Sequence, residues 1–185
     1  MKKLALAAII ALTTTAITAK EIKVLPILTD SNYCLTPSLS LLGGYGAFSE
    51  ANDGSTMYGV ELAIACPALQ LENLDIKQQI SYVYSSNDGL TTNSIEFNPH
   101  VMFNIADKLQ LGVGPGFGLV FADVEGGESD LVFGLNFGAS LNYDITTSMF
   151  VGAEARYQWT TDADFGGGDT TLDNYRTLLK VGMHF

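Results

Sequence analysis

Eight stretches of the chain alternate between apolar residues and polar or small ones, with the period of two that a β-strand produces. The clearest stretch, 109–121, has Leu, Val, Pro or Phe at every second position and mostly glycine between them. Each stretch has roughly ten residues, the length that a tilted strand needs to cross a membrane. The strands that this pattern predicts are 37–48, 57–66, 74–84, 94–105, 109–121, 131–143, 149–159 and 174–185.

The connections between these strands alternate in length. Long, polar connections follow the first, third, fifth and seventh strands, and shorter turns follow the second, fourth and sixth. An even strand number with this alternation is typical of outer-membrane barrels, which have long loops outside and short turns in the periplasm. We therefore predict an all-β fold for residues 37–185: an eight-stranded antiparallel up-and-down transmembrane β-barrel.

The alternation alone does not say which face of the wall points inward, because a soluble lipocalin-like barrel has the same period. Side chains just fill the interior of an eight-stranded barrel. The apolar face holds several bulky residues per strand, too much volume for that interior, whereas the other face carries glycine and charged residues. We therefore predict that the apolar face points outward into lipid. Aromatic residues near both strand ends, such as Tyr58, Trp159 and Tyr143, fit interfacial girdles.

Pro99 and Pro115 conflict with a regular barrel wall, because each removes a backbone donor in the middle of a predicted strand. A closed barrel has no free edge on which a proline avoids this loss. A turn centred near Asp107 would place the two prolines directly opposite each other. The sequence therefore predicts a local bulge or break between these two strands.

The two ends of the sequence carry signs of export. Residues 1–19 have a positive start, a short apolar run and a small, polar final part, which is typical of a signal peptide. Residues 20–36 form a lead-in that we assign to the periplasm as a plain segment, an extra strand or a small plug. The last strand ends on Phe185, which resembles the terminal strand of outer-membrane barrels. This resemblance implies that Phe185 is an assembly signal read by the barrel-assembly machinery.

Charged residues on the inward face need partners when they are buried. Pairing the last two strands about their loop places Glu154 near Lys180, and Gln158 near Arg176. We interpret the inward charges as a polar network that fills the interior, and the alternative is a narrow ion path. The predicted network consists of Glu61, Lys77, Glu96, His100, Glu154, Arg156, Arg176 and Lys180, and Asp75 is also expected to face inward.

The two cysteines, Cys34 and Cys66, belong to a chain that is predicted to enter an oxidising compartment. Cys34 precedes the first predicted strand and Cys66 ends the second, so both lie at the same end of an up-and-down hairpin. We predict a disulfide bond between them, and the alternative is two separate buried thiols. No histidine is near either cysteine in sequence, so the pair does not indicate a metal site.

The formal net charge is −11, which argues against nucleic acid as a partner because phosphate binding needs a basic surface. The four long connections are acidic and contain no lysine or arginine. No motif indicates a cofactor or a metal, since 162–173 matches a calcium loop only in part and Gly166 provides no ligand at its fifth position. His100 lacks the His-x-Ser pattern of barrels that modify lipid A, so we predict no enzymatic activity.

The last third of the chain has the most specific likeness to a known family. The run Glu-Ala-Arg-Tyr-Gln-Trp at 154–159, a polar loop, Asp-Asn at 173–174 and Phe185 resemble the final hairpin of the transmembrane domain of outer-membrane protein A and of opacity-type surface barrels. The resemblance implies a bacterial outer-membrane location, contact with outer-membrane lipid and lipopolysaccharide, and assembly by periplasmic chaperones.

From this resemblance we expect a monomer with a structural or surface-interaction role. Such a role covers envelope integrity, adhesion, or recognition of a host or surface ligand by the acidic extracellular loops. The alternatives are a small porin or ion channel and a lipid-modifying outer-membrane enzyme.

Overall fold

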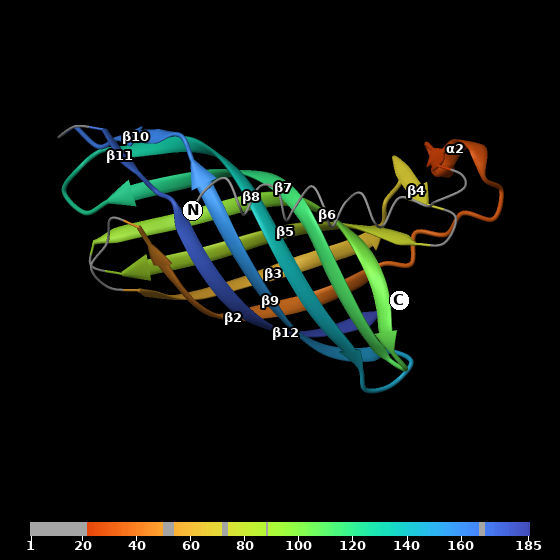
Figure 1. Cartoon of the computed structure of the whole chain (residues 1–185). Helices are drawn as coiled ribbons and strands as arrows, with labels where there is room; N and C mark the ends of the chain where they lie inside the picture. Colours follow the sequence, from red (N-terminus) through yellow and green to blue (C-terminus); the bar gives the residue numbers. More distant parts are fainter. Residues whose placement is uncertain (1–21, 50–53, 72–73, 88, 167–168) are drawn as a thin grey trace, which may run out of the picture.

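The computed structural model describes residues 22–49, 54–71, 74–87, 89–166 and 169–185. Its main feature is a closed barrel in which each strand is antiparallel to both of its neighbours (Figure 1). The barrel strands are β2 (Ser38–Phe48), β3 (Ser55–Ala65), β5 (Asp75–Asn87), β6 (Leu90–Ala106), β7 (Leu109–Val124), β8 (Ser129–Asp144), β9 (Met149–Thr160) and β12 (Asn174–His184). The wall order is β12-β2-β3-β5-β6-β7-β8-β9, so the predicted eight-stranded up-and-down barrel is confirmed.

The strands extend further toward the long connections than the sequence pattern predicts. β6 begins at Leu90 rather than at residue 94, β7 continues to Val124, and β8 begins at Ser129. Asp123 is paired with Ser129 near the tip of the β7–β8 hairpin. Apart from Leu90 and Val124, the added residues of β6, β7 and β8 are polar or small, which hides the period of two that identifies a strand.

The two ends of the barrel differ. The long connections lie at one end, together with the small sheet of β10 (Asp162–Asp164) and β11 (Asp169–Thr171), and we call this the outer end (Figure 1). The short turns, the C-terminus and α2 (Pro26–Thr29) lie at the opposite end, which we call the periplasmic end. No helix in the described ranges is long and apolar enough to cross a membrane.

The lead-in forms a small structure at the periplasmic end. β1 (Ile22–Val24) pairs with β4 (Leu69–Leu71), which belongs to the connection between β3 and β5. The Tyr33 hydroxyl donates a hydrogen bond of 2.6 Å to the carbonyl oxygen of Ala65 at the end of β3. The described part of the lead-in therefore contains an extra strand that is added to a connection and not to the barrel wall. The predicted signal peptide, 1–19, lies outside the described residues.

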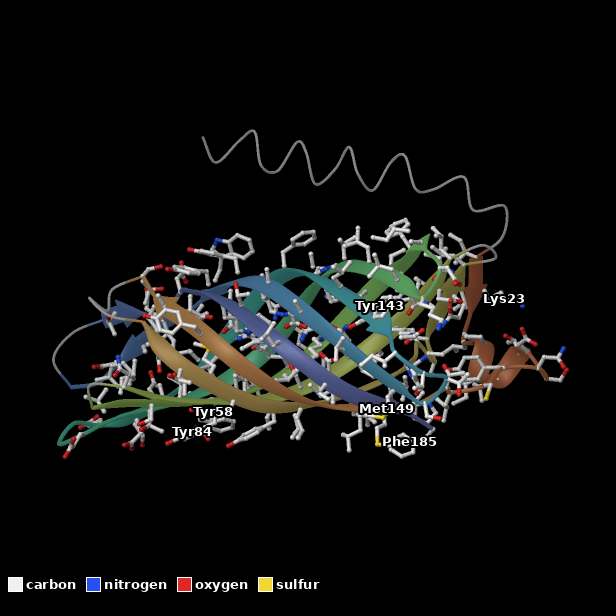
Figure 2. All side chains as sticks on the ribbon, turned by 90° about the horizontal axis from the view of Figure 1, so that it is seen from below. Lys23, Tyr58, Tyr84, Tyr143, Met149 and Phe185 are labelled. Carbon is white, nitrogen blue, oxygen red and sulfur yellow. The ribbon has the colours of Figure 1, made fainter. Side chains whose placement is uncertain are left out.

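The exterior of the barrel wall is apolar between its two ends. Leu41 and Leu179 are both 66% exposed, although leucine is normally a core residue. Tyr58 and Tyr84 point outward near the outer end, and Tyr143 does so near the periplasmic end (Figure 2). The prediction that the apolar face points outward is confirmed, and such a surface is stable only in contact with lipid.

The pairing of β6 with β7 is interrupted at the two prolines. Pairing runs as far as Phe97 on β6 and resumes at Val101, with Pro99 in the gap opposite Pro115 of β7. A Cβ atom at Gly114 would lie only 1.9 Å from the carbonyl oxygen of Pro99. Glycine at this position therefore lets the strands stay close although donors are missing, and the predicted local break is confirmed.

Candidate functional site in the barrel lumen

Buried ions in the lumen form a chain of alternating charge. Lys180 Nζ lies 2.7 Å from Glu154 Oε2, as the sequence predicts, and 2.7 Å from Glu61 Oε2. Arg156 Nε lies 3.0 Å from Glu154 Oε1 and 4.0 Å from Glu96 Oε2. We call the whole chain the ionic ladder; in order of contact it consists of Glu61, Lys180, Glu154, Arg156, Glu96 and Arg176.

The ionic ladder crosses the lumen from one wall to the other. Arg176 on β12 donates through Nη2 to Glu96 Oε2 on β6, and these strands lie on opposite sides of the barrel. Arg156 on β9 reaches Gln79 Oε1 on β5, also on the opposite side, at 3.5 Å. Side chains therefore occupy the full width of the lumen at this level.

The ladder is neutral and shielded from bulk water. Its side chains are between 0% and 5% exposed, and its three carboxylates face three cations. Removing one partner of a buried ion pair is strongly destabilising, because the remaining charge has neither water nor a counter-ion. The ladder consequently favours the one arrangement of strands in which every charge meets its partner.

The structure brings six of the eight predicted network residues together in the ladder. A seventh, His100, lies beside it, with Nδ1 at 3.1 Å from Ser140 Oγ and Nε2 at 3.5 Å from Arg156 Nη2. The eighth, Lys77, does not join the ladder. Its Nζ donates to Gln110 Oε1 at 3.4 Å nearer the periplasmic end.

Two details of the predicted lumen need correction. Gln158 is opposite Asn174, two residues away from the expected register, and not opposite Arg176. Gln158 and Arg176 both contact Glu96 instead, because that carboxylate reaches them from the other wall. Asp75 is exposed, because β5 begins there, at the rim where the lumen ends.

The two cysteines lie at the periplasmic end but are not joined. Cys34 is an exposed free thiol and Cys66 a buried one, so the predicted disulfide bond is absent from the structure. Cys34 faces solvent while Cys66 is enclosed, and the chain between Cys34 and β2 has a left-handed backbone at Thr36, with φ 41. Burial raises the pKa of the Tyr33 phenol, and nearby charge on Cys66 and on Cys34 raises it further.

Apolar side chains share the outer part of the lumen with polar ones such as Ser85, Ser94 and Asn174, a feature that the sequence analysis did not single out. The available signal was that Val83, Val120 and Val132 interrupt the polar and glycine-rich inward set. These side chains form one buried cluster, which we call the apolar layer. It consists of Leu42, Phe48, Met57, Val83, Val120, Ala122, Val132 and Leu178. Leu42 and Leu178 extend it down to the ladder, where they are opposite Lys180 and Glu154.

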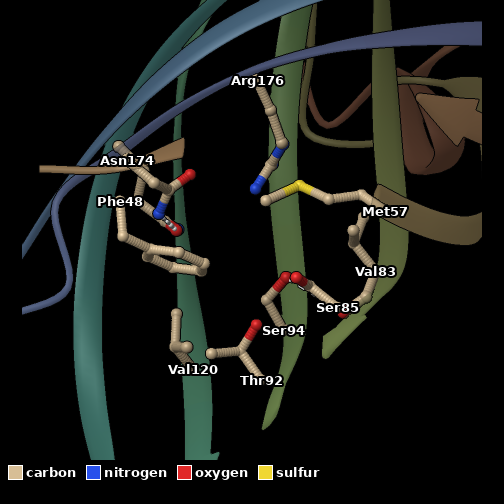
Figure 3. A pocket seen from close by; sticks show the side chains of 10 residues that line it. Phe48, Met57, Val83, Ser85, Thr92, Ser94, Val120, Asn174 and Arg176 are labelled. Carbon is tan, nitrogen blue, oxygen red and sulfur yellow. Dashed lines mark hydrogen bonds between the residues drawn. The ribbon is translucent and has the colours of Figure 1, made fainter. Parts of the chain in front are cut away.

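Two small cavities lie among the described residues of the lumen. One of about 10 Å³ lies between the apolar layer and Arg176 of the ladder (Figure 3). Another of about 20 Å³ lies at the periplasmic end, lined by Glu61, Lys77 and His184 among others. A cavity of this size holds about one water molecule. The described side chains therefore leave no open channel along the barrel.

His100 and Ser140 are a histidine–serine pair that a search for His-x-Ser misses, because they come from β6 and β8. They are 0% and 1% exposed, so a lipid substrate cannot reach them. No group of three or more histidine, cysteine, aspartate or glutamate side chains in the described ranges is placed to hold a metal ion.

Comparisons with known proteins agree with this architecture. No protein-family model and no curated protein matches the sequence, but solved structures do. Neisserial surface protein A (NspA) has 14% identity and a TM-score of 0.54, covering 81% of this chain and 95% of that chain. The fold is that of the outer-membrane β-barrels. The apolar exterior independently requires a membrane, so the predicted outer-membrane location is confirmed.

Two other solved structures with this fold differ in the roles that their names state. Ail, the attachment invasion locus protein of Yersinia pestis, has 12% identity and a TM-score of 0.51, covering 80% of this chain and 95% of that chain. The outer membrane enzyme PagL has 16% identity and a TM-score of 0.50, covering 78% and 97%. The shared barrel thus carries both kinds of protein, and it does not by itself assign a function.

Proposed function

We propose that this protein is a closed, structural outer-membrane barrel that presents acidic loops to a positively charged partner outside the cell. The observation that carries the proposal is the contrast between its filled lumen and its exposed outer end. A filled lumen suits a barrel whose work is done at the surface, through envelope integrity, adhesion or recognition.

Two neighbouring hairpins at the outer end combine into one acidic surface, which we call the acidic crest. The backbone N–H of Asp164 donates to Asp130 Oδ2 at 2.9 Å, which joins the β9–β12 connection to the start of β8. The outer connections contain no lysine or arginine. The exposed acidic side chains of the crest are Asp123, Glu125, Glu128, Asp162 and Asp164.

Electrostatics favours a basic partner for this surface. Like charges gathered on one side of a protein create a potential that attracts opposite charge and speeds association. This attraction extends over roughly 10 Å at 0.1 M salt and weakens as salt is added. Ail is named for attachment and NspA as a surface protein, and their fold is suited to this kind of role.

The binding proposal is tested with purified protein in phosphatidylcholine nanodiscs. Binding to immobilised polylysine should be several times stronger than binding to polyglutamate, and it should weaken steeply with salt. The variant Glu125→Gln/Glu128→Gln should lose much of this binding. The matched control is Asp75→Asn/Asp107→Asn, which removes two exposed charges at the periplasmic end. Equal loss in both variants would contradict a role for the crest.

We also propose that the protein is not an enzyme, although PagL shares its fold. The support is the burial of His100 and Ser140, the histidine–serine pair found in the lumen. Mass spectrometry of lipid A from cells with and without the protein should give the same acylation pattern. A lost or added acyl chain that depends on the protein would contradict this proposal.

A further inference from the structure

The strand that pairs with the lead-in, β4, covers part of the lipid-facing wall. Ile76 shares the outward face of β5 with Tyr82, which is 42% exposed, yet Ile76 itself is 5% exposed. Gln70 of β4 lies against it, accepting a hydrogen bond of 3.1 Å from the Ile76 N–H and donating one of 2.9 Å to the Ile76 carbonyl oxygen. Because β5 begins at Asp75, the wall ends at this level. β4 therefore lies beside the barrel where the membrane meets the periplasm.

The two-stranded ribbon of β1 and β4 has one apolar and one polar face. Residues that are directly paired across two antiparallel strands share a face. The apolar face consists of Ile22 paired with Leu71 and Val24 paired with Leu69. The polar face consists of Lys23 paired with Gln70. Since Gln70 is bonded to the end of the barrel wall, the polar face is turned toward the wall and the apolar face away from it.

The apolar face of the ribbon is uncovered within the described ranges. Ile22 and Val24 are 56% and 61% exposed. The short helix α2 follows β1 and adds two more exposed apolar side chains, Ile27 at 48% and Leu28 at 78%. Figure 1 shows α2 and β4 next to each other at the periplasmic end, to one side of the barrel. Apolar side chains that gather on a surface mark contact with a membrane or another protein.

The position of the ribbon favours lipid as the occupant of this face. The barrel exterior is an interface with lipid, and the ribbon adjoins that interface at Ile76. Apolar surface at the edge of a bilayer sinks roughly 5–10 Å into the boundary between headgroups and acyl chains. The Lys23–Asp30 ion pair, at 2.5 Å, comes from the polar side of the ribbon and can stay among headgroups and water.

We propose that the ribbon and α2 form an interfacial anchor, which inserts apolar side chains into the periplasmic leaflet of the outer membrane. The lead-in is then a second lipid contact, made by a segment outside the barrel wall. This inference goes beyond the proposed surface role and does not depend on it, because the anchor and the acidic crest lie at opposite ends of the barrel.

The test is quenching of tryptophan fluorescence by phosphatidylcholine brominated near the top of its acyl chains. The chain has one tryptophan, Trp159, so the probes are made in a Trp159→Phe background. Val24→Trp and the matched control Lys23→Trp place the probe on opposite faces of one strand. In nanodiscs with one barrel each, brominated lipid should quench the Val24→Trp probe several times more strongly than the Lys23→Trp probe. Acrylamide in the water should quench the two probes in the reverse order.

Equal quenching of the two probes by brominated lipid, or none at position 24, would overturn the proposal. Protection of the Val24→Trp probe from acrylamide without quenching by bromine would also overturn it, because protein and not lipid would then cover the face. Heat-modifiable gel migration checks that each barrel is folded. Should the Val24→Trp chain not fold, Leu28→Trp gives the same test at a side chain that is 78% exposed.

Discussion

The two parts of the lumen show two ways to fill the same barrel. The ionic ladder fills its part of the lumen by contacts of fixed direction. Lys180 must reach both Glu61 and Glu154, and Arg176 must reach Glu96 on the opposite wall. The apolar layer relies on volume, since its side chains only have to fill space without gaps. The inward positions of the same strands supply both parts, so the β-barrel wall itself does not decide between them.

This difference teaches what each part contributes. Directional ion pairs penalise any register in which a charge loses its partner, so the ladder selects one strand arrangement. Apolar packing tolerates substitutions that conserve volume, and polar side chains such as Ser94 and Asn174 lie beside it. Four predictions follow from this contrast, beginning with the largest expected effect.

Lys180→Met should destabilise the barrel most, because it leaves Glu61 and Glu154 buried without their shared cation. The expected loss is ~3–5 kcal/mol in the free energy of unfolding, measured by urea titration in lipid vesicles with heat-modifiable migration as the readout. Lys23→Met is the control, because the Lys23–Asp30 pair is open to solvent, with side chains 47% and 24% exposed, and pairs at the surface contribute about 1 kcal/mol or less. Similar losses in the two variants would refute the directional role of the ladder.

Met57→Ala should cost less, roughly 2–4 kcal/mol, because it removes apolar volume and leaves no charge unpaired. Met57→Leu conserves volume and should cost under about 1.5 kcal/mol. The same urea titration measures both variants. Met183→Ala is a control on the lipid-facing side, where the side chain is 48% exposed. If Met57→Leu lowers the free energy of unfolding as much as Met57→Ala does, the layer depends on specific contacts as the ladder does. The two parts of the lumen would then not differ in the way described above.

Gly46→Ala should cost about 1–3 kcal/mol through overpacking, since its Cβ would lie 2.5 Å from Met57 Cε and 2.9 Å from the Tyr175 carbonyl oxygen. Gly43→Ala is the matched control on the same strand, because a Cβ there would have nothing within 4 Å. Thermal unfolding in detergent, read by circular dichroism, compares the two. Equal melting temperatures would show that the layer has room to spare.

The smallest effect concerns the loops at the outer end of the barrel. Backbone N–H groups of Asp164 and Leu131 donate to the Asp130 carboxylate at the outer end and hold its pKa below the ordinary value. Because the pKa is lowered in the folded state, the stabilisation by the ionised Asp130 carboxylate is complete above the ordinary aspartate pKa of about 3.9. This stabilisation is lost as the pH falls through the lower folded-state pKa. The NMR signal of the Asp164 amide should therefore shift only at pH values below about 3.9. Asp130→Asn should remove the shift, and a shift that persists would assign it to another group.

The sequence predicted the barrel wall well, because outward and inward residues alternate wherever lipid and lumen impose opposite demands. It also predicted the Pro99–Pro115 break, which depends on strands adjacent in sequence. It placed Glu154 near Lys180, and the two side chains do meet, although Glu154 is opposite Leu178, two residues from the expected register. The Arg176–Glu96 pair was out of reach, because it joins opposite walls and depends on how the barrel closes.

The apolar layer was harder to recognise than the ladder. Val83 and Val120 look like ordinary strand residues in the sequence, and only the closed barrel shows that they meet in the lumen. The predicted disulfide bond failed for a similar reason. Placing both cysteines at one end of the barrel does not determine the direction of their side chains, and Cys34 is exposed while Cys66 is buried.

β12 pairs with β9, the barrel strand that precedes it in sequence, and with β2, the first strand of the barrel. The pairing of His184 with Ser38 therefore closes a chain segment that contains all the remaining barrel strands. The entropy cost of this closure must be overcome before the β2–β12 contacts can stabilise the barrel, which makes assembly slow. Until then, the free edges of β2 and β12 expose unpaired amides and carbonyls that invite aggregation. Whether a newly exported chain folds or aggregates thus depends on how well the edges of β2 and β12 are shielded from the strand edges of other chains.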